Sequence, residues 1–294
     1  MWRRASQIIG WLALAGTLQA CSAVKIVYDR AADLAYWYLD GYVDFTEAQS
    51  LQVKDELAKL QAWHRQTQLP SYIEALQKLQ QQMPGVLDAG QACAVFDDVR
   101  RKLMAVSEQA EPAVAGLART LGSQQLAQLE RKFNQGNANY KSDFLTASPQ
   151  ARHNKRYKLA VKRAETLYGR LDEKQLELVA QGLRQSSFDA ELGYTERLRR
   201  QSDALQSLRA LAASRLTTVD TLEKNRATIH ALFERSLNSP HVVYREYLEK
   251  LTLDSCKLFT SLHNSTSASQ RGKAVETLNR YEQDLTTLTG KDRN

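Results

Sequence analysis

The chain has 294 residues, of which 43% are hydrophobic, and a formal net charge of +7 at pH 7. This length is enough for one large domain or two small ones. The chain lacks alternating β-branched runs bounded by turn residues, so the composition argues against a β-sheet protein.

The first twenty-one residues have the organisation of an export signal. Arg3 and Arg4 form a positive start, and residues 8–18 form an apolar stretch of 11 residues. A spanning helix needs about 20 apolar residues, so this stretch is too short to be a permanent membrane anchor. The segment Leu18-Gln19-Ala20-Cys21 then places small or tolerated residues ahead of a cysteine.

This four-residue segment resembles the lipobox of Gram-negative lipoproteins, in which Gln19 is a less usual choice. The resemblance implies that Cys21 becomes the mature N-terminus and carries three acyl chains, and two or more chains anchor a protein stably. The residue after Cys21 is Ser22 and not aspartate. By analogy with enterobacterial lipoproteins, this favours the periplasmic face of the outer membrane. The alternative is an ordinary secretory peptide with a chance cysteine. Removal of residues 1–20 lowers the formal charge from +7 to +5.

The region after the signal is expected to be all-α, an elongated bundle of roughly ten to twelve helices. Helix formers dominate, and apolar residues recur at helical spacing, as at Val53, Leu57 and Leu60. We expect every proline to lie at a helix break, because an interior proline costs about 3 kcal/mol. These prolines are Pro70, Pro84, Pro112, Pro149 and Pro240. Residues 21–294 are predicted to form one helical periplasmic domain, with a subdivision near 112–122 or 215 as the alternative.

Aromatic residues crowd the segment directly after Cys21: Tyr28, Tyr36, Trp37, Tyr38, Tyr42 and Phe45. Aromatic side chains are enriched both in cores and at membrane interfaces. Four interspersed aspartates suit anionic lipid poorly, so core packing is favoured over membrane contact: Asp29, Asp33, Asp40 and Asp44.

Several short segments follow Cys21-Ser22 in a fixed order: Tyr28-Asp29-Arg30, Trp37-Tyr38-Leu39-Asp40, Gln49, Trp63-His64-Arg65 and Leu69-Pro70-Ser71-Tyr72. This order resembles a family of uncharacterised Gram-negative lipoproteins known only as a domain of unknown function. The resemblance is strongest over residues 20–75. It implies a helical lipoprotein of the cell envelope and no particular activity.

Trp63-His64-Arg65, near the end of a predicted helix, is the most distinctive polar cluster. His64 and Arg65 are candidates for binding a phosphate or carboxylate, because arginine offers a planar fork of donors. The alternative, which we favour, is structural: both side chains satisfy free carbonyl groups at the helix C-terminus.

A short pattern occurs three times, at Thr46–Gln49, Gly122–Gln125 and Asp172–Gln175, each time after an apolar residue. A capping-type residue followed three places later by glutamine predicts a helix N-terminus. The pattern also resembles the L-T-x-x-Q motif of periplasmic helical chaperones, which implies binding of unfolded clients. Common capping is the simpler explanation.

Cys93 and Cys256 remain once Cys21 is assigned to lipid. An oxidising periplasm permits a disulfide between them, and two unpaired buried thiols are the alternative.

Positive charge concentrates in residues 131–215, which carry a net +8. The candidate residues for binding an anionic envelope component or protein partner lie in this block: Arg152, Lys155, Arg156, Lys158, Lys162 and Arg163. A solvated helix face is the alternative, and the export signal argues against nucleic acid as the partner.

Signatures of catalysis, metal binding and cofactor binding are absent from the sequence, which lacks H-E-x-x-H, C-x-x-C and glycine-rich phosphate loops. We therefore expect no cofactor, no metal and no enzyme activity. The expected function is binding or scaffolding at the outer membrane, with chaperone-like client binding and cell-wall hydrolysis as alternatives.

Overall fold

The computed structural model describes residues 23–214 and 219–290, so the export signal and Cys21 lie outside the described residues. Over the described residues it consists of helices without strands, which confirms the all-α prediction and its range of ten to twelve helices. The elements in chain order are α2 (Ala23–Asp29), α3 (Ala31–Val43), α4 (Glu47–Trp63), the π-turn η1 (His64–Gln68), α5 (Leu69–Gln82), α6 (Ala89–Ala118), α7 (Ser123–Tyr140), the π-turn η2 (Lys141–Leu145), α8 (Pro149–Tyr168), α9 (Glu173–Gln185), α10 (Ala190–Ala213), α11 (Val219–Leu237), α12 (Val242–Ser265) and α13 (Ala268–Thr289).

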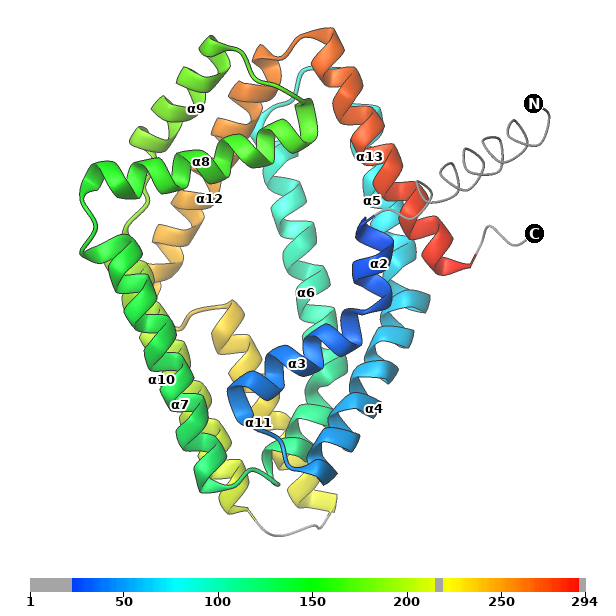
Figure 1. Ribbon diagram of the computed structural model, residues 1–294, viewed down its shortest axis with the longest axis vertical. Coiled ribbons are helices and arrows are strands. Elements are labelled where there is room, and N and C mark those ends of the chain that lie inside the picture. Colours follow the sequence, from blue (N-terminus) through cyan, green and yellow to red (C-terminus); the bar gives the residue numbers. More distant parts are fainter. Residues whose placement is uncertain (1–22, 215–218, 291–294) are drawn as a thin grey trace, which may run out of the picture.

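The helices form an elongated frame (Figure 1). Helices α7 and α10 pack along one long side, and α5 packs on α13 along the other, where α4 continues the line of α5. Helices α8 and α9 lie at one end, and α11 packs on α6 at the other. Helix α3 crosses in front of α6 and α11 in this view.

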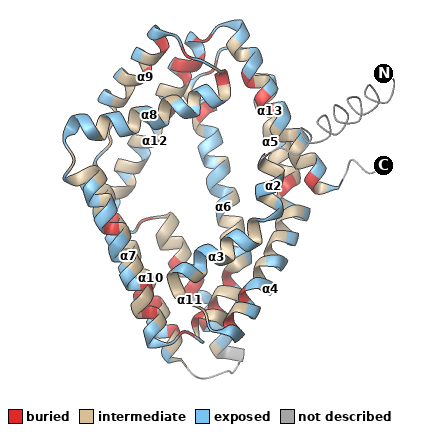
Figure 2. Cartoon of the chain, in the orientation of Figure 1, coloured by how far each residue is buried: buried red, intermediate tan, exposed pale blue. Residues whose placement is uncertain are grey.

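Two separate clusters of buried apolar residues support the two ends of the frame, as Figure 2 illustrates. The larger cluster includes Met83, Tyr168, Val179 and Leu262, and joins α8, α9, α12 and α13. The smaller one packs Ala115 and Ala118 of α6 against residues of α10 and α11: Leu211, Ile229 and Leu232. Burial of such side chains contributes roughly 1.5–3 kcal/mol each.

The prediction that Pro112 marks a helix break is wrong, because α6 continues through it as one helix of 30 residues. Proline removes one backbone hydrogen bond, and here packing of the following turns, Ala115 and Ala118, offsets the cost. The other four prolines lie in first turns or between helices. Helix α6 packs on both α11 and α12 and so connects the two ends. Subdivision near 112–122 or 215 stays a prediction, and residue 215 is outside the described ranges.

The three repeated caps are confirmed as the N-termini of α4, α7 and α9. In each, the backbone N–H of the cap residue donates to the glutamine Oε1 three places later. Two further copies, Asp88–Gln91 before α6 and Ser267–Gln270 before α13, were missed in the sequence.

The glutamines of these caps also pair with one another across the fold. Gln49 and Gln125 exchange hydrogen bonds of 3.3 and 2.7 Å between their side-chain amides. Gln175 and Gln270 do the same at 2.8 and 2.9 Å. Each amide also donates to a backbone carbonyl of the partner's connection, at Thr120, Asp44, Ser265 and Arg170. The chain thus fastens two pairs of helix starts, which we call the glutamine pairs.

Cys93 on α6 and Cys256 on α12 are joined by a disulfide in the structure, with Cα atoms 5.5 Å apart. It is the pair proposed from the sequence, and it closes 163 residues of chain. The Cys256 side chain is fully buried.

Reduction of this disulfide should lower the free energy of unfolding by up to about 5 kcal/mol, because the unfolded chain gains the entropy of a long open loop. Urea titration with and without reductant measures the change. The C93S/C256S variant should have the unfolding curve of the reduced protein, both with and without reductant. Identical unfolding curves for oxidised and reduced wild type would contradict a stabilising disulfide.

His263 of α12 is fully buried between two partners. Its Nε2–H donates to the Gly85 carbonyl oxygen at 2.9 Å, so its Nδ1 accepts from the Tyr168 hydroxyl at 2.9 Å. Burial lowers the pKa of His263, against the raising effect of the Gly85 carbonyl, and burial raises the pKa of Tyr168. The neutral imidazole therefore holds the connection after α5 to α8 and α12.

This burial predicts an acid-sensitive fold. An unfolded histidine binds a proton near pH 6.5, whereas burial lowers the pKa of folded His263 below that value, so its contribution is complete above pH 6.5 and is lost as pH falls below it. Stability measured from pH 8 to 5 should decline less steeply for His263→Gln than for wild type. The exposed control His241→Gln should keep the wild-type slope. Parallel slopes for all three proteins would exclude His263 as a source of the decline.

Candidate functional site

A groove between α8 and α9 gathers basic side chains from both helices. Arg152, His153 and Arg156 come from α8, Arg184 from α9, and Phe188 from the connection that follows. None of the described residues that line it is an aspartate or glutamate. Positive side chains without matching carboxylates attract anionic groups.

Helix caps and a tight connection position the two walls of this groove. Ser148 Oγ accepts from the Ala151 N–H at the start of α8, and Asp172 caps α9 in the same way with Gln175. Between the helices Gly169 has φ 75°, in the left-handed region that suits glycine. The resulting hairpin brings Arg156 beside the C-terminal end of α9.

The Arg156 guanidinium is the central group of the groove. It donates to the Leu183 carbonyl oxygen at 3.3 Å and to Ser186 Oγ at 3.1 Å, and it lies 4.2 Å from the centroid of the Phe188 ring. Half-buried, it has no ion pair with any described carboxylate, and burial lowers its pKa. A partly desolvated cation without a counter-charge is a favourable site for an anion.

The other candidate residues of α8 divide into two groups. Arg152 donates to the Phe144 carbonyl oxygen at 3.0 Å at the edge of the groove, and Lys155 pairs with Asp143. Lys158, Lys162 and Arg163 are exposed along the helix. The structure therefore brings Arg152 and Arg156 together and leaves the others on the outer surface. Arg184, which pairs with Glu177, and His153 were not predicted as site residues. Their contribution depends on the hairpin, which the spacing in the sequence does not show.

His64 and Arg65 lie on η1, away from α8, and bind residues of α2. His64 Nδ1 is 2.9 Å from the Tyr28 hydroxyl and its Nε2 is 3.3 Å from that of Tyr72, and burial lowers its pKa. Arg65 donates to Asp29 at 2.8 Å. These contacts fasten α2 to the body of the protein, which differs from both functions weighed in the sequence.

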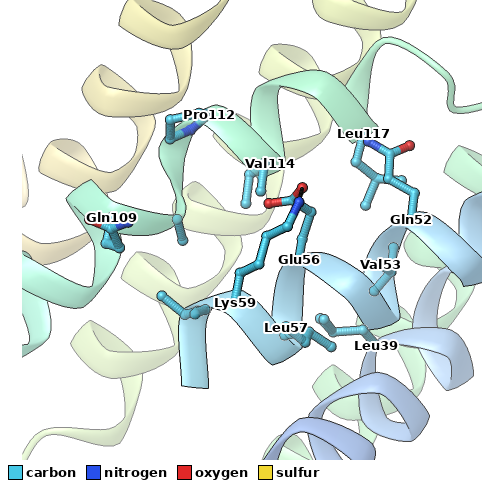
Figure 3. A pocket seen from close by; sticks show the side chains of 13 residues that line it. Leu39, Gln52, Val53, Glu56, Leu57, Lys59, Gln109, Pro112, Val114 and Leu117 are labelled. Carbon is cyan, nitrogen blue, oxygen red and sulfur yellow. Dashed lines mark hydrogen bonds and ion pairs between the residues drawn. The ribbon is translucent and has the colours of Figure 1, made fainter. Parts of the chain in front are cut away.

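A second groove, between α4 and α6 with Leu39 of α3, is largely apolar (Figure 3). Val53, Leu57 and Leu117 line it, and Pro112 forms part of the α6 side. Lys59 at its rim pairs with Glu56 at 3.0 Å. Its aliphatic walls provide apolar contact area, and its charged lining residues are the ion-paired Glu56 and Lys59.

The two buried glutamates are both held by cations. Glu111 of α6 lies 2.7 Å from His230 Nδ1 and 3.4 Å from Arg226. Burial alone would raise the pKa of Glu196, but hydrogen bonds from Arg199, Arg200 and Ser239 leave it lowered. An ionised, fully bonded carboxylate is a poor general acid. Through Ser239, Glu196 ties α10 to the connection between α11 and α12.

Within residues 23–214 and 219–290 no cluster of histidine, cysteine, aspartate or glutamate could hold a metal ion. No helix in the same ranges is both long and apolar enough to cross a membrane.

The fold and groove define an all-helical protein whose candidate site is a basic groove. The chain belongs to a family of unknown function (DUF6279), whose model matches residues 41–235. The match extends well beyond residues 20–75, where the sequence resemblance was strongest. No curated protein and no solved structure matches the chain.

Proposed function

We propose that the protein is a lipid-anchored, non-catalytic component of the periplasmic face of the outer membrane that binds an anionic group of an envelope partner. The groove between α8 and α9 is the binding site in this proposal. The observation that carries it is the half-buried Arg156 guanidinium without a carboxylate partner. The anchor is supported by the export signal and the lipobox-like segment before Cys21.

The chemistry of the groove favours a carboxylate or a phosphate as the bound group. Arginine has five N–H donors, and the contacts to Leu183 and Ser186 leave others for a ligand. Arg152 lines the same groove and adds positive charge, and His153 and Arg184 add further N–H groups to the lining. The Phe188 ring holds the guanidinium in place from one side. Binding should therefore weaken as salt concentration rises.

Replacing Arg156 by glutamine should weaken binding of a labelled hexaglutamate peptide about tenfold at low salt, because a charge-assisted hydrogen bond contributes about 1.5–3 kcal/mol. Fluorescence anisotropy with unacylated protein measures the affinity. The matched control is Arg131→Gln, which removes the same charge from an exposed position of α7.

The control should bind as the wild type does, and circular dichroism should show the same helix content for all three proteins. An equal loss of affinity in both variants would show that net charge alone accounts for the effect. Wild-type protein that binds neither the peptide nor inorganic pyrophosphate would remove the groove from consideration.

The anchor predicts a second outcome. Cys21→Ser should abolish incorporation of labelled palmitate, because serine has no sulfur for the thioether, and should release the protein from the membrane fraction. Labelling and envelope fractionation of cells that express each form measure both effects. A C21S form that stays in the outer membrane with unchanged labelling would contradict lipid attachment at this residue.

A further inference from the structure

Helices α2 and α3 present an apolar face to the outside. Ile26 and Val27 of α2 have 54% and 57% of their surface exposed, and Trp37 and Tyr38 of α3 have 70% and 65%. Leu34, at 46%, lies between them along the chain. Positions 34, 37 and 38 share one side of a helix, since residues three and four apart are neighbours on its surface. We call these five residues the outward face.

The opposite side of the same helices holds them to the body. Tyr28 contacts His64, and Tyr36 donates to Ser50 Oγ at 2.9 Å. Tyr42 packs near Phe133 of α7. Tyr38 lies on the same side of α3 as Tyr42 and packs on it, with ring centroids 5.0 Å apart, yet it stays 65% exposed, and Trp37 is 70% exposed. Core packing, which the sequence favoured for the whole segment, accounts for only part of it.

Arginine side chains balance two of the four aspartates that argued against membrane contact. Asp29 pairs with Arg65 at 2.8 Å, and Asp33 pairs with Arg30 at 3.6 Å. Asp40 accepts from the Phe45 N–H at 2.9 Å, which orders its side chain at the end of α3. The two ion pairs reduce the negative charge that an anionic surface meets beside the outward face.

The position of the outward face in the sequence indicates which surface it contacts. Helix α2 begins two residues after Cys21, and residues 8–18 before it are apolar. A membrane-bound group is thus attached within a few residues of Ile26. We propose that the outward face, Ile26, Val27, Leu34, Trp37 and Tyr38, lies in the headgroup region of the bilayer that holds the anchor. This proposal rests on the proposed attachment at Cys21.

Interfacial seating fits the chemistry of these side chains. Tryptophan and tyrosine prefer the boundary between headgroups and acyl chains, where the ring is buried and the polar atom stays wet. Helices that lie in this plane bury one apolar side by a few ångström. The contacts of His64 and Arg65 with α2 would then fix the orientation of the whole frame on the membrane.

Tryptophan fluorescence tests the contact directly. After removal of residues 1–20 the chain keeps two tryptophans, Trp37 and Trp63. Trp63→Phe leaves Trp37 as the only reporter, and Trp37→Phe leaves Trp63 as the control. Both acylated proteins are reconstituted into vesicles of phosphatidylethanolamine and phosphatidylglycerol that contain brominated lipid. Trp37 should be quenched and Trp63 should not. Unquenched Trp37 in vesicle-bound protein would overturn the proposal while leaving the anchor intact.

Unacylated protein separates the face from the anchor. The wild type should sediment with the same vesicles, and Val27→Glu should weaken this binding about tenfold, because a charged side chain resists burial at the interface. Val243→Glu of α12, where the valine is 65% exposed, is the matched control and should bind as the wild type does. Equal binding by both variants and the wild type would overturn the proposal. Analytical ultracentrifugation without lipid should show a monomer, and a dimer that V27E dissociates would instead assign the face to a second copy.

Discussion

The two glutamine pairs are the constraint on which the arrangement of helices depends. Each joins helix starts 76 or 95 residues apart. Gln49 and Gln175 are buried, and an amide at such a position is stable only when its donors and acceptor are all bonded. The first pair joins the N-terminus of α4 to that of α7, and the second joins the N-terminus of α9 to that of α13. The hairpin that carries the basic groove and the helices α2 and α3 therefore hold defined positions in one frame (Figure 1).

The frame links the two surfaces proposed to have a function, which lie far apart in the sequence. His64 and Arg65 bind Tyr28 and Asp29, so these contacts hold α2 against the body of the protein. On α8, Arg156 offers positive charge without a carboxylate partner. A protein held to the membrane through α2 and α3 would present the groove to the periplasm at a fixed height.

Local features were predictable from the sequence, and contacts between distant residues were not. The caps at Thr46, Gly122 and Asp172 follow from neighbours three places apart, because backbone donors at a helix start need a partner nearby. The pairing of Gln49 with Gln125 depends on tertiary structure, as does the docking of Asp29 on Arg65. Pro112 was misread because local propensity was given more weight than the packing of α6 on α11. In the basic block, only the hairpin distinguishes the half-buried Arg156 from the exposed Lys158.

Mass spectrometry of the N-terminal peptide of the protein isolated from envelopes tests the central claim most directly. The account predicts a peptide that begins at Cys21 and carries the mass of the attached acyl chains. A peptide that begins elsewhere, or an unmodified Cys21, would contradict attachment to lipid. The outward face and the basic groove would then have to act without a membrane anchor.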